Sequence, residues 1–266
     1  MDVVIVPTAA DVGTHAADVV AARIAAQPDT VLGVATGSSP VGIYRELARR
    51  RAEGSLELGR LTCFALDEYV GLAPGHPRSY AAYLDREIAR PWGLPSARVR
   101  APEASRPDLA EAAEEYEQAI AAAGGIDLQI LGIGTNGHIG FNEPISSLSS
   151  RTRVTALSAQ TRADNARFFD GPDAVPTHCL TQGLGTILDA RRVLLVAQGE
   201  RKAAAVAAAV EGPVAARCPA SALQFHPHAT LVLDEAAASA LTLPHHHRPV
   251  PDRGDGAVPG SPAAAS

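Results

Sequence analysis

Long hydrophobic runs are absent from the sequence, and no segment approaches the roughly 18 consecutive apolar residues that a membrane-spanning helix needs. The N-terminal segment MDVVIVPTAA carries an aspartate where a secretory signal would be basic, and its apolar run is short. These features predict a soluble, cytoplasmic protein with no membrane partner.

Basic clusters are lacking as well. Lys and Arg total 23 against 29 Asp and Glu, which gives a formal net charge of −6. A protein that binds a nucleic-acid backbone usually shows a patch or stripe of Lys and Arg, so we expect no nucleic-acid partner. A small anion remains compatible with this composition, because a few local cations are enough to bind it.

Cysteine is scarce, with three residues in the chain, Cys63, Cys179 and Cys218. Their odd number and wide spacing argue against a disulfide framework and against a zinc knuckle. We expect all of them to be small buried hydrophobic residues.

What is present is a regular alternation of short β-branched runs and longer alanine-rich amphipathic segments. The runs predict strands and the segments predict helices. Strands that alternate with helices indicate βαβ units, and hence an α/β protein with a mostly parallel sheet and helices on both faces. The predicted strands are 2–7, 30–36, 61–69, 126–134, 191–198 and 230–235, and the predicted helices are 14–26, 40–52, 79–89, 108–123 and 200–210.

With 266 residues and 46% hydrophobic content, the chain is long enough for one large α/β domain. We expect residues 1–242 to form this single domain. Residues 243–266 are rich in Pro, Gly and Ala without periodicity, which predicts a disordered tail. The triplet His245 to His247 in this tail is interpreted as a solvated tract, with metal binding as the alternative.

Loops that follow strands deserve attention, because open parallel sheets bind ligands at the carboxyl ends of their strands. The first such loop contains Thr36, Gly37, Ser38 and Ser39, followed by Pro40. Serine is a good helix N-cap, proline suits the first helical position, and glycine allows a tight turn. The backbone N–H groups at such a helix start can bind a phosphate. The alternative is an ordinary capped helix.

A second loop begins with the adjacent carboxylates Asp67 and Glu68. Their repulsion in a shared pocket would raise the pKa of one of them toward the range of a useful general base. Adjacent residues on a strand point to opposite sides, however, so one of the two is expected to face the site. The pattern does not decide which one, and solvated or helix-capping carboxylates are the alternative.

The third loop lies in LGIGTNGHIGFNEP, residues 131–144. Gly132, Gly134 and Gly137 match the G-x-G-x-x-G pattern of dinucleotide-binding proteins. Pro144 leaves little room for the helix that should hold a pyrophosphate, and the acidic position expected about 20 residues downstream falls in TALS. Dinucleotide binding is therefore disfavoured.

His138 lies in the same loop, and Asn136 and Glu143 are close enough in sequence to orient its ring and fix its tautomer. A histidine in this position either moves protons in a site or is a satisfied core residue. Taken together, the three loops offer a phosphate cradle, a carboxylate base and a histidine with polar partners. These are the parts needed for proton transfer on a sugar phosphate.

Six segments between about Val31 and Glu235 form a distinctive set: ATGSSPVGIYREL, LDEYVGLAPGHPRSY, LGIGTNGHIGFNEPISSLSSRTR, QTRADNARFF, LTQGLGTILDARRVLLVAQGERKAAAVAAAVEG and LQFHPHATLVLDE. In order, they resemble the corresponding segments of glucosamine-6-phosphate deaminases. The resemblance implies a doubly wound, Rossmann-like α/β fold of the sugar-phosphate isomerase type, and an enzyme of amino-sugar catabolism and N-acetylglucosamine utilisation that uses no organic cofactor. The reaction implied is the conversion of glucosamine 6-phosphate and water to fructose 6-phosphate and ammonia, which requires no metal.

Position by position, the resemblance implies that Asp67 takes the C2 proton and returns it at C1. His138 would open the pyranose ring, with Asn136 and Glu143 completing its hydrogen-bonded chain. Asn136 stands where some members have Asp, so Glu143 would supply most of the charge support. The phosphate would lie on the loop of Thr36, Gly37, Ser38 and Ser39. Arg167 and Lys202 would supply the cations that bind it.

A second phosphate site occurs in members that N-acetylglucosamine 6-phosphate activates, and Ser146 and Arg153 match that site. Thr155 stands where those members have lysine, and no tyrosine follows Tyr116 although they contribute one from the C-terminal region. We predict weak or absent activation.

The alternatives are a 6-phosphogluconolactonase-type hydrolase, a galactosamine-6-phosphate deaminase and a sugar-phosphate sensor that is not an enzyme. The segments GHIGFNEP and LDEYVGL follow the deaminase pattern, which disfavours the lactonase. A sensor would need a DNA-binding module, and the first predicted strand begins too close to Met1 for a helix-turn-helix ahead of it. The sequence leaves the glucosamine or galactosamine preference open, as well as assembly into a homo-oligomer.

Overall fold

The computed structural model describes residues 1–243 and 247–249, whose strands form two sheets. The main sheet has eight strands in the order β11-β1-β10-β9-β6-β2-β3-β5, and all neighbouring pairs are parallel. A second sheet of three antiparallel strands has the order β4-β8-β7. The strands are β1 (Asp2–Val6), β2 (Val31–Val34), β3 (Thr62–Ala65), β4 (Asp67–Tyr69), β5 (Val99–Arg100), β6 (Leu128–Leu131), β7 (Arg153–Ala156), β8 (His178–Thr181), β9 (Val193–Ala197), β10 (Ala229–Asp234) and β11 (His247–Pro249).

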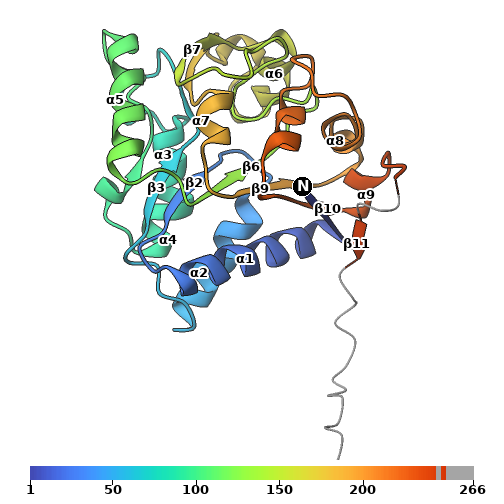
Figure 1. Cartoon of the computed structure of the whole chain (residues 1–266). Helices are drawn as coiled ribbons and strands as arrows, with labels where there is room; N and C mark the ends of the chain where they lie inside the picture. The colour runs from blue at the N-terminus through green and yellow to red at the C-terminus, as the bar shows by residue number, and fades with distance from the viewer. Residues whose placement is uncertain (244–246, 250–266) are drawn as a thin grey trace, which may run out of the picture.

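Helices cover both faces of the main sheet (Figure 1). One hydrophobic cluster lies between the sheet and α1, α2 and α4, and another lies between the opposite face and α5, α7 and α8. Neighbouring strand residues alternate between the two clusters, as Leu194 and Leu195 do. The helices are α1 (Ala9–Ala26), α2 (Val41–Ala52), α3 (Tyr80–Leu84), α4 (Arg90–Trp92), α5 (Leu109–Ala122), α6 (Ala159–Asn165), α7 (Leu184–Leu188), α8 (Ala203–Val210) and α9 (Glu235–Ala238), with a π-helical turn η1 (Asp85–Ala89) and 3₁₀ turns η2 (Ser96–Arg98), η3 (Ala166–Phe168), η4 (Pro172–Ala174), η5 (Glu200–Lys202) and η6 (Pro219–Phe225).

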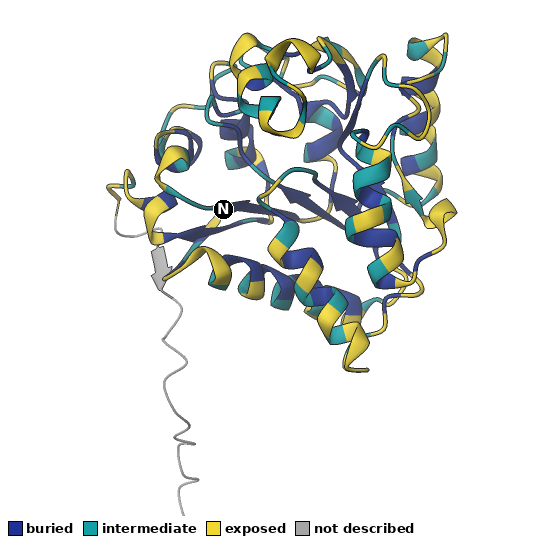
Figure 2. Cartoon of the chain, turned by 180° about the vertical axis from the view of Figure 1, so that it is seen from behind, coloured by how far each residue is buried: buried dark blue, intermediate teal, exposed yellow. Residues whose placement is uncertain are grey.

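The predicted α/β class, with a mostly parallel sheet and helices on both faces, is confirmed. Figure 2 shows the buried strands passing between helices whose outward faces are exposed. Cys63, Cys179 and Cys218 are buried free thiols, as expected. Within the described part of the chain, no helix is long and apolar enough to cross a membrane.

The order of the strands places a ligand site. From β2 the chain moves outward through β3 to β5, whereas from β6 it moves the other way through β9 and β10. The direction reverses between β2 and β6, which are neighbours in the sheet. Ligands of open α/β sheets bind outside the carboxyl ends of the strands at such a reversal. The loops after β2 and β6 are the ones that carry Thr36 to Ser39 and His138.

The structure differs from the predicted elements in three places. The predicted strand 61–69 is split at Leu66, whose N–H bonds to Val34 in the main sheet and whose carbonyl accepts from Gln182. The strand β4 that follows belongs to the antiparallel sheet. The elements β7, α6, β8 and α7 were not predicted, because their segments are short and lack a clear period. Residues 247–249 of the expected tail pair with β1, whereas 244–246 and 250–266, with His245 and His246, lie outside the described residues.

A close contact between two glycines sets the spacing of α1 and α2. A Cβ atom built on Gly13 would lie 3.0 Å from the backbone of Gly42, and one built on Gly42 would lie 3.1 Å from the Cα of Gly13. Because the neighbouring atoms are backbone, they cannot turn away as a side chain would. The position of α2, and of the Thr36 to Ser39 loop that precedes it, therefore depends on this contact.

We expect Gly13→Ala to lower the free energy of unfolding by about 1 kcal/mol, since overpacking costs about 1–3 kcal/mol and the better helix propensity of alanine returns about 1 kcal/mol. Urea denaturation measures this change. Gly59→Ala is the matched control, because a Cβ there meets no atom within 4 Å. Equal stability of the Gly13→Ala variant and the wild type would contradict the packing argument.

Candidate active site

A cavity of about 580 Å³ opens at the carboxyl ends of the central strands, within the size range of small-molecule sites. Its walls come from the loops after β2, β3, β6 and β9 and from the segment of α6 and η3. Eight of the ten predicted site residues line it: Thr36, Gly37, Ser38, Ser39, Asp67, His138, Arg167 and Lys202. Asn136 and Glu143 do not line the cavity.

Two side chains from other parts of the chain donate hydrogen bonds to carbonyl groups of the loop after β2. Tyr83 donates to the Gly37 carbonyl at 2.8 Å, and Gln198 donates to the Ser39 carbonyl at 3.1 Å. Gly37 has φ +87°, a conformation that glycine adopts without strain. The sequence predicted a serine N-cap with Pro40 as the first helical residue, but α2 begins at Val41 and Pro40 is its N-cap. Within the described chain, no side chain makes a capping hydrogen bond there. The N–H groups of the first turn are therefore not used by a capping side chain, which suits an anion.

Asp67 and Glu68, which the sequence pattern did not separate, have different partners. Glu68 accepts backbone N–H bonds from Tyr69, Tyr80 and Ala81 at 2.8 to 2.9 Å, so it anchors the start of α3. Asp67 lines the cavity, and within the described structure its buried Oδ1 has no hydrogen-bond partner. Asp67 is therefore the carboxylate available for chemistry.

The pKa of Asp67 is raised well above the usual aspartate range, first by burial and second by the charge of Glu68. Repulsion was the expected cause, and it is the smaller one. Asp67 is 4% exposed, so its ionised form loses most of its hydration. Such a carboxylate is a stronger base than an aspartate in water.

The glycines of the third loop make room for the histidine. A Cβ on Gly134 would lie 2.3 Å from the ring of His138, and one on Gly137, where φ is +83°, would lie 2.7 Å from Cys218 Sγ. Gly134 also accepts from the Gly137 N–H and donates to the His138 carbonyl. The G-x-G-x-x-G spacing therefore forms a tight turn that cradles an imidazole.

The third loop also approaches Asp67. A Cβ on Gly140 would lie 3.7 Å from Asp67 Oδ2 and 3.2 Å from Thr181 Oγ1. The absence of a side chain at this position lets the segment that follows His138 pass beside the carboxylate. The two titratable groups consequently line one cavity.

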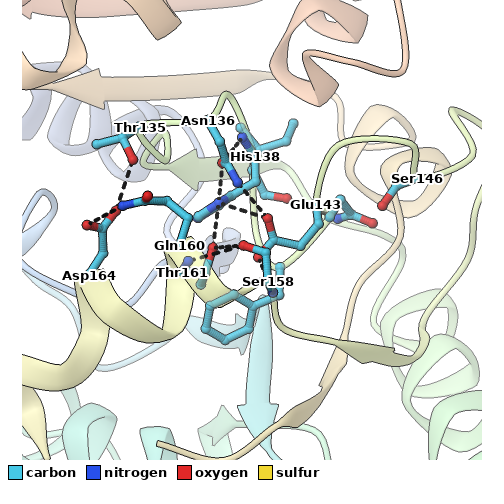
Figure 3. A network of polar contacts seen from close by, with 12 residues as sticks. Thr135, Asn136, His138, Glu143, Ser146, Ser158, Gln160, Thr161 and Asp164 are labelled. Carbon is cyan, nitrogen blue, oxygen red and sulfur yellow. Dashed lines mark hydrogen bonds and ion pairs between the residues drawn. The ribbon is translucent and has the colours of Figure 1, made fainter. Parts of the chain in front are cut away.

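A chain of hydrogen bonds runs behind His138 (Figure 3). The ring Nδ1 lies 2.8 Å from Asn136 Oδ1, Asn136 Nδ2 donates to Glu143 Oε2 at 2.7 Å, and Glu143 Oε1 accepts from the Ser158 N–H at 3.2 Å. An amide oxygen can only accept, so Nδ1 carries the hydrogen and Nε2 is the basic nitrogen. Glu143 Oε2 is 3.8 Å from the ring, so its support reaches the histidine mainly through Asn136.

The pKa of His138 is lowered from its usual value. Burial is the largest cause, the charge of Glu143 opposes it, and the charge of Lys202 adds to it. A neutral imidazole with a fixed tautomer can accept one proton at Nε2 and return it, which suits movement of a proton between two oxygen atoms of a ligand.

Cations also line the cavity. Arg167 donates to Ser38 Oγ at 3.2 Å, and Lys202 donates to the Ile133 carbonyl at 2.7 Å. Burial lowers the pKa of Lys202. Arg201 and Asp164 also line the cavity and were missed by the sequence analysis. Arg201 could have been found because it follows β9, a strand of the same sheet edge, whereas nothing in the pattern around Asp164 marked it.

The donor set of the cavity suits an anion better than a metal. Among residues 1–243 and 247–249, no three His, Cys, Asp or Glu side chains gather as metal ligands. The cavity lining carries the cations Arg167, Arg201 and Lys202 and the backbone N–H groups of the Thr36 to Ser39 loop, beside the carboxylates of Asp67, Asp164 and Glu200.

The model of the family of glucosamine-6-phosphate isomerases/6-phosphogluconolactonase matches residues 7–232. The chain belongs to this family. A glucosamine-6-phosphate deaminase of Arthrobacter sp. (strain FB24) is 56% identical over 248 residues, or 93% of this chain and 95% of the relative. One from Streptomyces avermitilis is 55% identical over 249 residues, again 93% and 95%. The resemblance found in the sequence is confirmed.

Solved structures of the family agree with the fold. A monomeric glucosamine-6-phosphate deaminase is similar with a TM-score of 0.88 and 41% identity, over 90% of this chain and 100% of that chain. The 6-phosphogluconolactonase of Leishmania guyanensis has a TM-score of 0.71 at 21% identity, over 91% and 99% of the two chains. At that identity the second likeness shows the shared fold alone.

Ser146 and Arg153, the residues expected to match the family's second phosphate site, lie together outside the cavity. Arg153 donates to Ser146 Oγ at 3.3 Å and to Asn142 Oδ1 at 2.9 Å. Thr155 is two residues further along β7. The guanidinium is thus engaged by two polar side chains of the protein.

We expect Glu143→Gln to lower the pKa of His138 further. The carboxylate stabilises the protonated ring, so its loss favours the neutral form by about one pKa unit or less, while glutamine can still accept from Asn136. A pH titration of the His138 ring by NMR measures the shift. Glu57→Gln, a change at an exposed carboxylate, is the control. An unchanged or raised pKa in Glu143→Gln would show that Glu143 does not support the charge.

Proposed function

We propose that this chain is an enzyme of amino-sugar catabolism that converts glucosamine 6-phosphate and water to fructose 6-phosphate and ammonia. The observation that carries the proposal is the pair of titratable groups in one cavity. Asp67 is a buried carboxylate with Oδ1 unpartnered within the described structure, and His138 has its Nδ1 committed to Asn136. The deaminases at 54 to 56% identity support the same activity.

The reaction begins with ring opening, because the closed pyranose has no acidic C–H bond. Nε2 of His138 accepts the proton of the O1 hydroxyl and delivers it to the ring oxygen as the C1–O5 bond breaks. The product is an open-chain aldehyde that still carries the C2 amine. Asn136 and Glu143 keep the ring oriented during both transfers.

Proton transfer between carbons follows. Asp67 removes the C2 proton, and the electron pair moves into an enolamine while O1 takes a proton from the protonated C2 amine. Asp67 then returns its proton to C1, which leaves an iminium at C2. Water adds to C2 and ammonia leaves, giving the ketose. The raised basicity of Asp67 matches this task, because a carboxylate at the usual aspartate pKa would be a weak base for a C–H bond.

The phosphate anchors the substrate in the cavity. Backbone N–H groups of Thr36 to Ser39 and the cations of Arg167 and Lys202 receive it. A fixed phosphate keeps C1 and C2 of the substrate beside Asp67 and His138, which lowers the entropic part of the activation barrier. The proposal includes residues 1–242 as a single catalytic domain, a cytoplasmic location and no organic cofactor.

We expect Asp67→Asn to lower kcat for glucosamine 6-phosphate by about 10³-fold or more, because the base is lost, with little change in KM. The assay quantifies ammonia and fructose 6-phosphate together. Asp2→Asn, at an exposed carboxylate far from the cavity, is the control. Turnover by Asp67→Asn at the wild-type rate would reject the assigned base, whereas absence of ammonia with the wild type would reject the deaminase itself.

The same variant should be more stable than the wild type at neutral pH. Because the folded-state pKa of Asp67 is raised, its contribution to stability is full below the unfolded pKa and is lost as the pH rises through the folded pKa. Asp67→Asn removes the group whose contribution to stability is lost with rising pH, so its free energy of unfolding should exceed the wild-type value at pH 7. The gain should disappear in acid, which denaturation at several pH values measures.

The alternative substrates are galactosamine 6-phosphate and a 6-phosphogluconolactone. The identity to named deaminases favours an amino sugar over the lactone. Parallel assays of the two epimeric amino-sugar phosphates and of lactone hydrolysis separate the three reactions.

Regulation is proposed to be weak. We expect the rate to depend hyperbolically on the concentration of glucosamine 6-phosphate. Addition of N-acetylglucosamine 6-phosphate should change the half-saturating concentration by less than about twofold. The reasons are that Arg153 already bonds two protein side chains, and that the lysine and the C-terminal tyrosine of the family's second site have no counterparts in this sequence. Initial rates with and without the acetylated sugar phosphate measure this. A sigmoidal curve that becomes hyperbolic would contradict it.

A further inference from the structure

Asp164 is a carboxylate in a cavity that we assign to an anionic substrate. It lies on α6, its side chain is 27% exposed, and it lines the cavity together with the cations. A carboxylate here repels a phosphate group, so its presence needs a physical reason. That reason is found in its contacts and in its effect on the neighbouring charges.

The contacts of Asp164 join three parts of the chain. Oδ2 accepts from Thr135 Oγ1 at 2.9 Å, and Oδ1 accepts from Gln160 Nε2 at 3.1 Å (Figure 3). Oδ1 is also 3.3 Å from a guanidinium nitrogen of Arg201. Thr135 follows β6 and Arg201 follows β9, so one side chain holds α6 against two strand-end loops. Thr135 directly precedes Asn136, the partner of His138.

Charges of both signs surround Lys202. Burial lowers its pKa, Asp164 raises it, and Arg167 and Arg201 lower it. His138 is affected in turn by Lys202 and by Asp164. Asp164 is therefore the negative charge that favours the protonated amine a phosphate needs. Five charged or titratable groups of the cavity lining are relevant to Lys202. They are Asp164 from α6, Arg167 from η3, Glu200 and Arg201 from η5, and His138 from the loop after β6.

Building on the proposed function, we propose that Asp164 is a positioning residue for the phosphate end of the cavity. Its carboxylate fixes α6 to the loops after β6 and β9 and supplies the counter-charge for the cations there. A purely structural role would need its hydrogen bonds and not its charge, and the two can be separated by mutation.

Asp164→Asn removes the charge and keeps an oxygen that accepts from Thr135. Loss of the charge lowers the pKa of Lys202, so Lys202 deprotonates earlier as the pH rises. In the pH profile of kcat/KM for glucosamine 6-phosphate, we expect the alkaline limb, where activity falls as the pH rises, to lie roughly 0.5–1 pH unit lower than in the wild type. At the midpoint of the wild-type limb, KM should rise about two- to sixfold, with kcat changed little. Calorimetry with inorganic phosphate should show the same earlier loss of affinity.

Two variants serve as comparisons. Thr135→Val keeps the charge and removes one hydrogen bond, so it should keep the wild-type alkaline limb while kcat falls. Asp173→Asn removes an exposed carboxylate of the neighbouring turn η4, outside the cavity lining, and should match the wild type. The proposal is overturned if Asp164→Asn keeps the wild-type limb and phosphate affinity, or if Asp173→Asn shifts them equally. Absence of ammonia with the wild type would reject the proposed function instead, and the phosphate titrations would still test Asp164.

Discussion

The buried carboxylate of Asp67 is the constraint on which the arrangement of the site depends. An ionised group with little hydration is unstable, and nothing in the described structure neutralises it by an ion pair. The fold tolerates this because the carboxylate lies where the chain leaves β3 of the main sheet and enters β4 of the small antiparallel sheet. Paired strands on both sides fix the backbone there, so the side chain cannot relax into water. The lost hydration of the carboxylate therefore both destabilises the folded state and makes the group more basic.

The neighbouring carboxylate shows how local bonding can separate two similar groups. Glu68 is also buried and its pKa is also raised by burial, but three backbone N–H groups oppose that effect. Those bonds commit it to the start of α3. Within the described part of the chain no N–H group donates to Asp67 Oδ1, and burial raises the pKa of Asp67 further than that of Glu68. Strand alternation predicted that the two would face different ways, and the hydrogen bonds decide which of them keeps a reactive oxygen.

Much of the fold and part of the site followed from the sequence, for identifiable reasons. The central strands of the main sheet are mostly apolar because both of their faces are buried, and this pattern is local. The loops of Thr36 and His138 were found because strand ends can be located from such patterns. The segment 153–188 was not, because its short strand β8 is stabilised by pairing with β4, which is distant in sequence, and β7 pairs in turn with β8. The role of Asp164 depends on contacts between that segment and the strand-end loops, so no local pattern could reveal it.

The glycine-rich loop shows why a motif needs its surroundings before it has a chemical meaning. In a dinucleotide site, the spacing of the glycines serves the close approach of a pyrophosphate to a helix start. Here the same spacing serves the approach of an imidazole: the missing side chain of Gly134 leaves the volume that the His138 ring fills, and the turn at Gly137 fits against Cys218. Both uses exploit the one property of glycine, the absence of a Cβ atom, and differ in what occupies the space. Pro144 and the residues around it determine the occupant, because they replace the long helix of a nucleotide site with a short loop that carries Glu143 back toward Asn136.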